Sequence, residues 1–108
     1  MMTNEQILHA AAKLSALVKV LDEAPDQEPK LGPEMDAVID QFRDDGDGVA
    51  LLRLAQAMLE GRGYEIHSAG SLSRYRSLAA HMGATIEEGE SPWGKLLHRL
   101  MILPPEKH

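Results

Sequence analysis

Apolar residues recur at three- and four-residue spacing along most of this chain, and this spacing restricts the fold more than any other feature. In residues 4–23 the repeat runs through Ile7, Leu14 and Leu21, which places these side chains on one face of an α-helix. Thr3 and Gln6, at the start of this stretch, form a capping-box pattern that should begin the helix. Similar stripes, separated by glycine and proline, predict further helices at residues 33–43, 48–60, 72–82 and 92–102. The pattern therefore favours an all-α protein.

One short segment departs from the helical spacing. Residues 64–68, "YEIHS", alternate apolar and polar side chains, which is typical of a strand. No second strand is recognisable as its partner, so we expect a short extended connection there. We predict a single-domain, all-α bundle of about five helices, an ordinary architecture for 108 residues. The helix at residues 48–60 is apolar over more than half its circumference and should be the most buried.

The net charge of −6 is concentrated in one segment. Residues 22–47 contain ten acidic residues and only two basic ones, Lys30 and Arg43, whereas the rest of the chain is nearly neutral. Such a block disfavours contact with nucleic acid and favours a partner protein with a basic surface. Four of its carboxylates are candidate partner-binding residues: Asp36, Asp40, Asp44 and Asp45.

Several classes of function find no support in the sequence. The chain has no cysteine, which removes disulfides, thiolate nucleophiles and cysteine-ligated zinc. Neither a nucleophile elbow nor a phosphate-binding loop motif occurs, so we expect no enzyme and no cofactor. No apolar run approaches the ~20 residues that span a bilayer, and the N-terminus lacks the basic region of a secretion signal. We therefore expect a cytoplasmic protein with no membrane partner.

The stretch "RDDGDG" before the third predicted helix raises the question of a calcium loop. If Gly48 stood at the sixth position of such a loop, Arg43 would stand at the first and Leu54 at the twelfth, where calcium needs oxygen ligands. We instead predict a turn in which Gly46 adopts a positive φ angle and Asp47 caps the following helix.

The five histidines do not form a recognisable metal motif. No pair has the spacing that places two imidazoles on one helix face beside a catalytic glutamate. His81 and His98 lie on different predicted helices and could meet Glu87 or Glu88 in space, although surface or structural roles suit them better. We predict no metal site.

These observations favour a small acidic, non-catalytic protein-binding module that acts through the surface of residues 22–47. Regulators, inhibitors and adaptors of the kind that phages and plasmids carry are typical of this class. The hypothesis rests on the charge pattern and on the exclusion of other functions.

The alternative is a DNA-binding transcriptional regulator. Residues 77–85, "SLAAHMGAT", loosely resemble the core of helix-turn-helix proteins. The resemblance implies that residues 72–102 present a recognition helix to DNA. Phosphate contacts would then come from four basic residues: Arg74, Arg76, Lys95 and Arg99. The acidic loop between the two predicted helices disfavours this alternative.

The first predicted helix has more apolar surface than a single stripe requires. Leu8, Ala11 and Val18 lie outside the stripe, and a large exposed apolar surface is uncommon on a monomer. We therefore expect a homodimer whose interface includes Leu8, Ala11 and Val18.

Overall fold

The computed structural model describes residues 2–106, and the chain forms two compact units, Met1–Gln56 and Ala57–His108. Its described residues combine helices with a three-stranded antiparallel sheet. The prediction of an all-α bundle of five helices is therefore wrong. The sheet lies entirely in the second unit.

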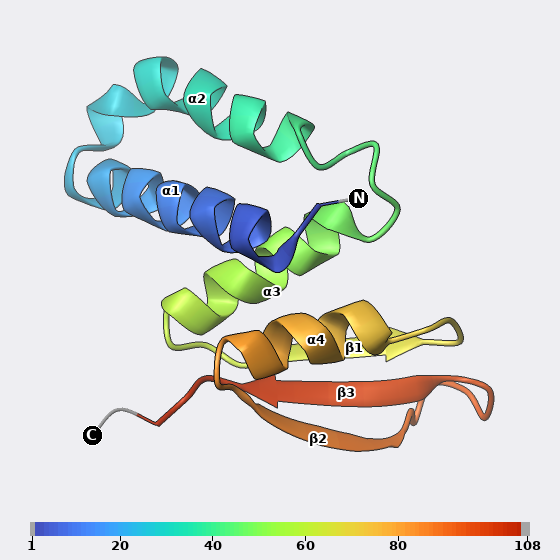
Figure 1. The fold of residues 1–108 in the computed structure, drawn as a ribbon. Helices are drawn as coiled ribbons and strands as arrows, with labels where there is room; N and C mark the ends of the chain where they lie inside the picture. The colour runs from blue at the N-terminus through green and yellow to red at the C-terminus, as the bar shows by residue number, and fades with distance from the viewer. Residues whose placement is uncertain (1, 107–108) are drawn as a thin grey trace. The chain divides into compact units, whose positions relative to one another are not determined.

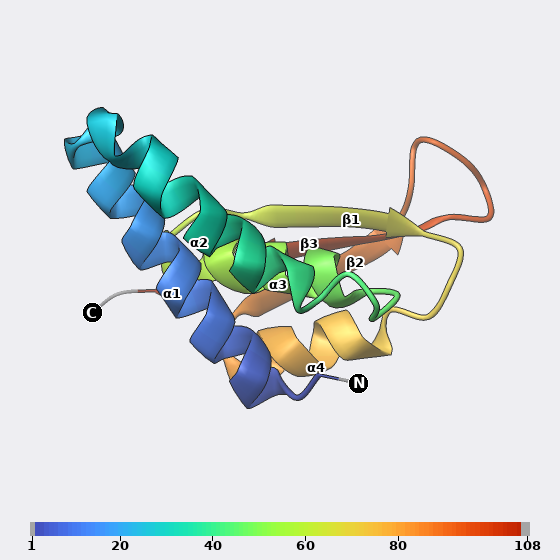
Figure 2. The same ribbon diagram turned by 90° about the horizontal axis from the view of Figure 1, so that it is seen from above.

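Two helices of the first unit run side by side in opposite directions (Figure 1), and Figure 2 shows the same pair from above. α1 spans Asn4–Glu23 and α2 spans Glu28–Asp40, joined by the short 3-10 helix η1 at Pro25–Gln27. Thr3 caps α1 with the predicted capping box. Its hydroxyl oxygen accepts the N–H of Gln6 at 3.1 Å, and the Gln6 side chain accepts the N–H of Thr3 at 2.8 Å.

α2 begins earlier than the predicted start at residue 33, so Pro33 lies inside the helix. A proline there removes one backbone hydrogen bond and costs about 3 kcal/mol in a helix interior. Val38 is buried on one side of α2, and the residues that extend this stripe are half-buried: Leu31, Met35 and Ile39. Packing of the stripe against α1 offsets the cost of the proline.

The segment "RDDGDG" forms a turn that leads into α3, which spans Gly48–Leu59. Asp47 precedes the helix, and its carbonyl accepts the N–H of Leu51 at 2.9 Å, the bond that an N-cap residue makes. α3 is the most buried helix, as its apolar composition predicted. Its buried apolar residues are Leu51, Leu52, Leu54, Ala55, Ala57 and Met58.

The glycine that the turn before α3 requires is not the predicted one. Among the described residues only Gly61 and Gly83 have positive φ angles, and both follow the end of a helix. The expectation of a positive φ at Gly46 is therefore wrong. Gly48 is needed instead, because a Cβ there would lie 2.6 Å from the carbonyl oxygen of Phe42.

The sheet of the second unit has the strand order β1–β3–β2 (Figure 1). β1 spans Tyr64–Ser68, β2 spans Thr85–Glu90 and β3 spans His98–Leu103. β3 lies in the centre and is antiparallel to both neighbours. α4, Ser73–His81, connects β1 with β2.

α4 covers one face of this sheet. Leu100 in β3 is fully buried, and Glu88 is its partner in the register of β2. Arg76 of α4 forms an ion pair with Glu88, so α4 lies on the face of Leu100. Because side chains alternate along a strand, Glu65 and Arg99 point to the opposite face.

The helix predicted at residues 92–102 does not form. Residues 91–97 are a loop, and the apolar run after them is β3. A short apolar run of this kind fits either helix or strand, and pairing on both sides decides for the strand. Residues 85–90, predicted as an acidic loop, are the edge strand β2. Its three glutamates discourage edge-to-edge association with another sheet.

Candidate functional site

The acidic residues predicted to bind a partner lie in the first unit, but they do not form one cluster. Asp36 and Asp40 are exposed one turn apart on α2, and Asp40 forms an ion pair with Arg43. In the turn before α3, Asp44 is exposed and Asp45 is half-buried. The structure therefore groups Asp44 with Asp45 and places the other two aspartates separately.

Asp44 and Asp45 line a pocket of about 360 Å³ together with Met2, Gln41 and Gly46. The Oδ2 atom of Asp45 accepts the backbone N–H of Met2 at 3.2 Å, which holds these two walls together. Two adjacent carboxylates attract a cation, and a guanidinium can donate parallel hydrogen bonds to them.

A wider groove of about 570 Å³ lies beside this pocket, between α1 and α2. The groove and the pocket share Met2 and Gln41. Ala10 and Val38 give the groove a buried apolar lining, and Glu5 and Lys13 add one charge of each sign. The combination suits an extended segment that carries both a charged and an apolar side chain.

The residues predicted for a dimer interface differ in exposure. Ala11 is fully buried, so it has no surface to offer a second copy and does not belong to an interface. Leu8 and Val18 are half-buried. Val20 is 45% exposed, but it lies two positions from Val18 and therefore on nearly the opposite side of the helix. α1 therefore offers a narrower apolar strip than the sequence predicted.

The predicted DNA-binding residues do not share a recognition helix, because residues 92–102 form a loop and a strand. Arg76 and Arg99 each form an ion pair with a glutamate at 2.5 Å. Lys95 is exposed in the loop between β2 and β3, and Arg74 is half-buried on α4. The helix-turn-helix geometry is therefore lost.

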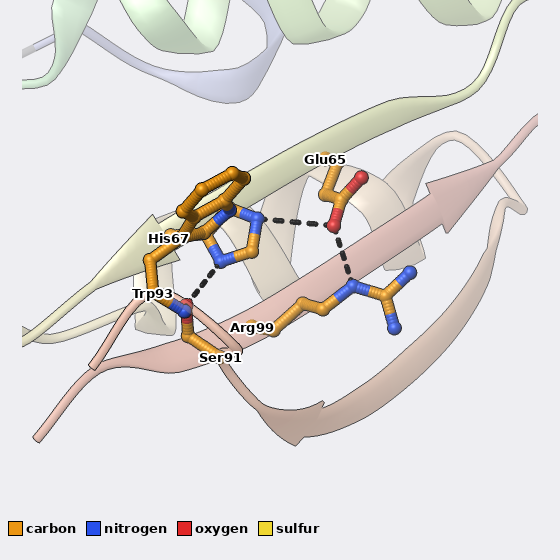
Figure 3. Close-up of polar contacts among 5 residues, drawn as sticks. All are labelled: Glu65, His67, Ser91, Trp93 and Arg99. Atoms are coloured by element: carbon orange, nitrogen blue, oxygen red, sulfur yellow. Dashed lines mark hydrogen bonds and ion pairs between the residues drawn. The ribbon is translucent and has the colours of Figure 1, made fainter. Parts of the chain in front are cut away.

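The second unit contains a chain of hydrogen bonds that the sequence did not predict (Figure 3). His67 lies with Nε2 3.0 Å from Oε1 of Glu65 and with Nδ1 2.6 Å from Oγ of Ser91. Arg99 donates from Nε to the same oxygen of Glu65 at 2.5 Å. The strands align these groups, since Glu65, His67 and Arg99 project from the same face of β1 and β3.

Arg99 favours the ionised form of Glu65. Its hydrogen bond is the main cause that lowers the pKa of Glu65 below 4.5; desolvation opposes this, and His67 adds to the lowering. Glu65 is therefore ionised at neutral pH and acts as an acceptor. A neutral imidazole must then carry its hydrogen on Nε2, so Nδ1 accepts from the hydroxyl of Ser91.

The order serine, histidine, carboxylate is the one that activates a serine nucleophile. Ser91, however, is only 7% exposed, and its Oγ also accepts the N–H of Trp93 at 3.1 Å. A nucleophile must be open to substrate and have donors placed for the oxyanion. These contacts instead fasten the loop of residues 91–97 to β1.

Two further contacts hold the same loop. The N–H of Ser91 donates to the carbonyl of Leu97 at 3.1 Å, which closes the loop at its base. The rings of His67 and Trp93 meet edge to face, with centroids 6.4 Å apart. Ser91 precedes the helix predicted at residues 92–102, but a serine hydroxyl can accept the N–H two residues on in a turn, and Ser91 does so here.

The histidines do not build a metal site in the part of the chain that the structure describes. Among residues 2–106 no three His, Asp or Glu side chains lie close enough to hold a metal ion. His98 is the register partner of Glu90 in β2, and His81 is exposed at the end of α4.

The fold and its sites define a general class: a helical unit followed by a β–α–β–β unit with a three-stranded antiparallel sheet. Comparison of the chain with protein-family models, with curated proteins and with solved structures finds no match. Within residues 2–106, no helix combines the length and apolar character needed to cross a membrane.

Proposed function

We propose that the chain is a non-catalytic binding protein that captures a basic segment of a partner protein on its first unit. The observation that carries the proposal is the pocket lined by Asp44 and Asp45. Acidic residues outnumber basic ones by eleven to five in residues 1–56, whereas the second unit contains equal numbers of the two. The negative electrostatic potential of the first unit attracts a basic partner, and Asp44 and Asp45 in the pocket bind its cationic side chain.

The adjoining groove narrows the kind of segment that fits. An arginine or lysine head between Asp44 and Asp45 would direct the following residues along the groove, toward Ala10 and Val38. An apolar side chain is favoured there, because it would cover an apolar lining. Glu5 and Lys13 both line the groove, so their charges offset one another and the main charge contact of the segment falls to Asp44 and Asp45.

Binding of this kind needs no reaction, which suits a regulator, inhibitor or adaptor. A cytoplasmic location belongs to the same proposal. The lack of cysteine fits a reducing compartment.

The proposal is tested with a short peptide that carries one arginine and one leucine, followed by amide chemical shifts in a ¹⁵N-labelled protein. We expect the largest shift changes at Asp44, Asp45 and Ala10. The double variant Asp44→Asn with Asp45→Asn should bind the peptide about tenfold more weakly or worse, since hydrogen bonds to charged groups contribute about 1.5–3 kcal/mol each. Asparagine keeps the side-chain shape and an acceptor for the N–H of Met2.

The matched control changes Asp26→Asn and Glu28→Gln, two exposed residues of the same unit outside the pocket. It removes the same amount of charge, so it should reduce affinity only through the long-range field. Equal losses in the two double variants, or no shift changes at the pocket, would show that Asp44 and Asp45 do not form the binding site.

A further inference from the structure

The loop between β2 and β3, residues 91–97, carries the most exposed large apolar side chains of the described chain. Trp93 is 79% exposed and Leu96 is 85% exposed. Apolar side chains are costly to leave in water, and a tryptophan is the largest of them. Two such residues three positions apart on one loop call for a partner that covers them.

The loop is held in this conformation by its own hydrogen bonds. The N–H of Ser91 donates to Leu97, the N–H of Leu97 donates to the carbonyl of Gly94 at 3.1 Å, and the N–H of Trp93 donates to Ser91. The hydrogen bond between Ser91 and His67 ties the loop to β1. The exposed side chains are therefore presented on an organised loop, which lowers the entropy lost when they bind.

The shape of the loop argues against a protein interface as its main purpose. Figure 2 shows the segment between β2 and β3 projecting beyond the ends of the strands. Trp93 and Leu96 together expose on the order of 300 Å² of side chain at this projecting tip. A small projecting apolar tip suits a soft surface into which it can insert.

The loop itself carries a positive charge. Lys95 is exposed between Trp93 and Leu96. Within residues 91–97 it is the only charged side chain, and Glu90 borders the loop at the end of β2. Lysine is attracted to anionic headgroups, and tryptophan is enriched where headgroups meet the hydrocarbon region.

We propose that the loop of residues 91–97 docks the protein peripherally on an anionic lipid surface. Trp93 and Leu96 enter the interfacial layer, and Lys95 meets lipid phosphate or carboxylate groups. The expectation of no membrane partner rested on the lack of a spanning segment and of a secretion signal, and peripheral docking needs neither. The site shares no residue with the acidic pocket of the first unit.

Trp93 is the single tryptophan of the chain, so its fluorescence reports on the loop directly. The probe is a titration with vesicles of phosphatidylcholine and phosphatidylserine in equal parts. We expect the emission to shift to shorter wavelength as the vesicles are added, and the protein to sediment with them. Vesicles of phosphatidylcholine alone should bind several-fold more weakly.

Substitutions at exposed positions separate the contributions of Leu96 and Lys95 to vesicle binding without disturbing the fold. Leu96→Ala should weaken vesicle binding about tenfold or more, since each buried methylene contributes roughly a factor of four. Lys95→Gln should weaken it about fivefold on the anionic vesicles only. Val20→Ser, at an exposed apolar residue on α1, should bind vesicles like the wild type.

Two results would overturn the proposal. One is an unchanged emission spectrum and no sedimentation with the anionic vesicles. The other is a shift to shorter wavelength that appears without lipid as the protein concentration rises, which would mean that a second copy of the chain covers the loop.

Discussion

Glu65 is the residue at which one carboxylate holds two partners, Arg99 and His67. Its pKa is lowered from 4.5 in the folded protein, mainly by the hydrogen bond from Arg99, so folding favours its ionised form. A lowered folded pKa gives stability that is present above the unfolded pKa and is lost as the pH falls through the folded value. The contribution of Glu65 should therefore begin to fall near pH 4.5 and be lost below its lowered folded pKa.

The variant Glu65→Gln tests this dependence. We expect its free energy of unfolding to fall less than that of the wild type between neutral pH and about pH 3, as measured by urea denaturation at each pH. Glu106→Gln, at an exposed glutamate outside the sheet, should follow the wild-type curve. Parallel curves for wild type and Glu65→Gln would show that the Arg99 contact adds no net stability.

Single residues also show where prediction from sequence is limited. Thr3 and Gln6 were predicted to cap α1, and they do so because both partners lie within one turn of the chain. The hydrogen bond between Ser91 and His67 was not predicted from the sequence, because 24 positions separate the two residues and only the sheet brings them together. Asp44 and Asp45 were chosen for their charge alone, and the pocket around them depends on the folded path of the chain.

At the scale of secondary structure, β3 decides whether the sheet exists. It lies between β1 and β2 and makes all the strand pairings of the sheet. We expect Leu100→Ala, at a fully buried residue of β3, to lower the free energy of unfolding by about 2–5 kcal/mol. Leu103→Ala, at a 37% exposed residue of the same strand, should lower it by less than about 1 kcal/mol.

Chemical denaturation followed by circular dichroism measures both values. The pair is matched, since each variant removes the same atoms from the same strand. Similar losses in the two variants would contradict the burial of Leu100 under α4.

The helices were easier to predict than the strands for a physical reason. α1 and α3 carry apolar stripes long enough to establish a period of 3.6 residues, so their ranges could be derived from spacing alone. β2 and β3 have six residues each, too few to separate one period from the other. Because residues 92–102 were predicted to be a helix, residues 64–68 had no strand with which to pair. They were therefore predicted to be an extended connection.

At the scale of the whole molecule, the predicted homodimer stays a prediction. Without Ala11, its interface on α1 would rest on Leu8 and Val18. We expect light scattering to give a dimer for the wild-type chain in the micromolar range. The double variant Leu8→Glu with Val18→Glu should be a monomer, because it places charge in the interface.

Circular dichroism serves as the control, because both residues are half-buried and the variant must stay folded to be informative. If light scattering gives a monomer for the wild-type chain throughout the micromolar range, the prediction of a dimer interface on α1 is wrong.

The central position of β3 also has a consequence for the order of events during translation. β1 and β2 do not pair with each other, so both wait without a partner until the ribosome has released β3. Synthesis proceeds at about 5–20 residues per second, and the thirteen residues from Ser91 to Leu103 therefore delay the sheet by on the order of a second. During that interval the glutamates of β2 keep an unpaired strand in solution, while the helices of the first unit already have the contacts they need. The sheet of the nascent chain can therefore form only once its third strand has emerged.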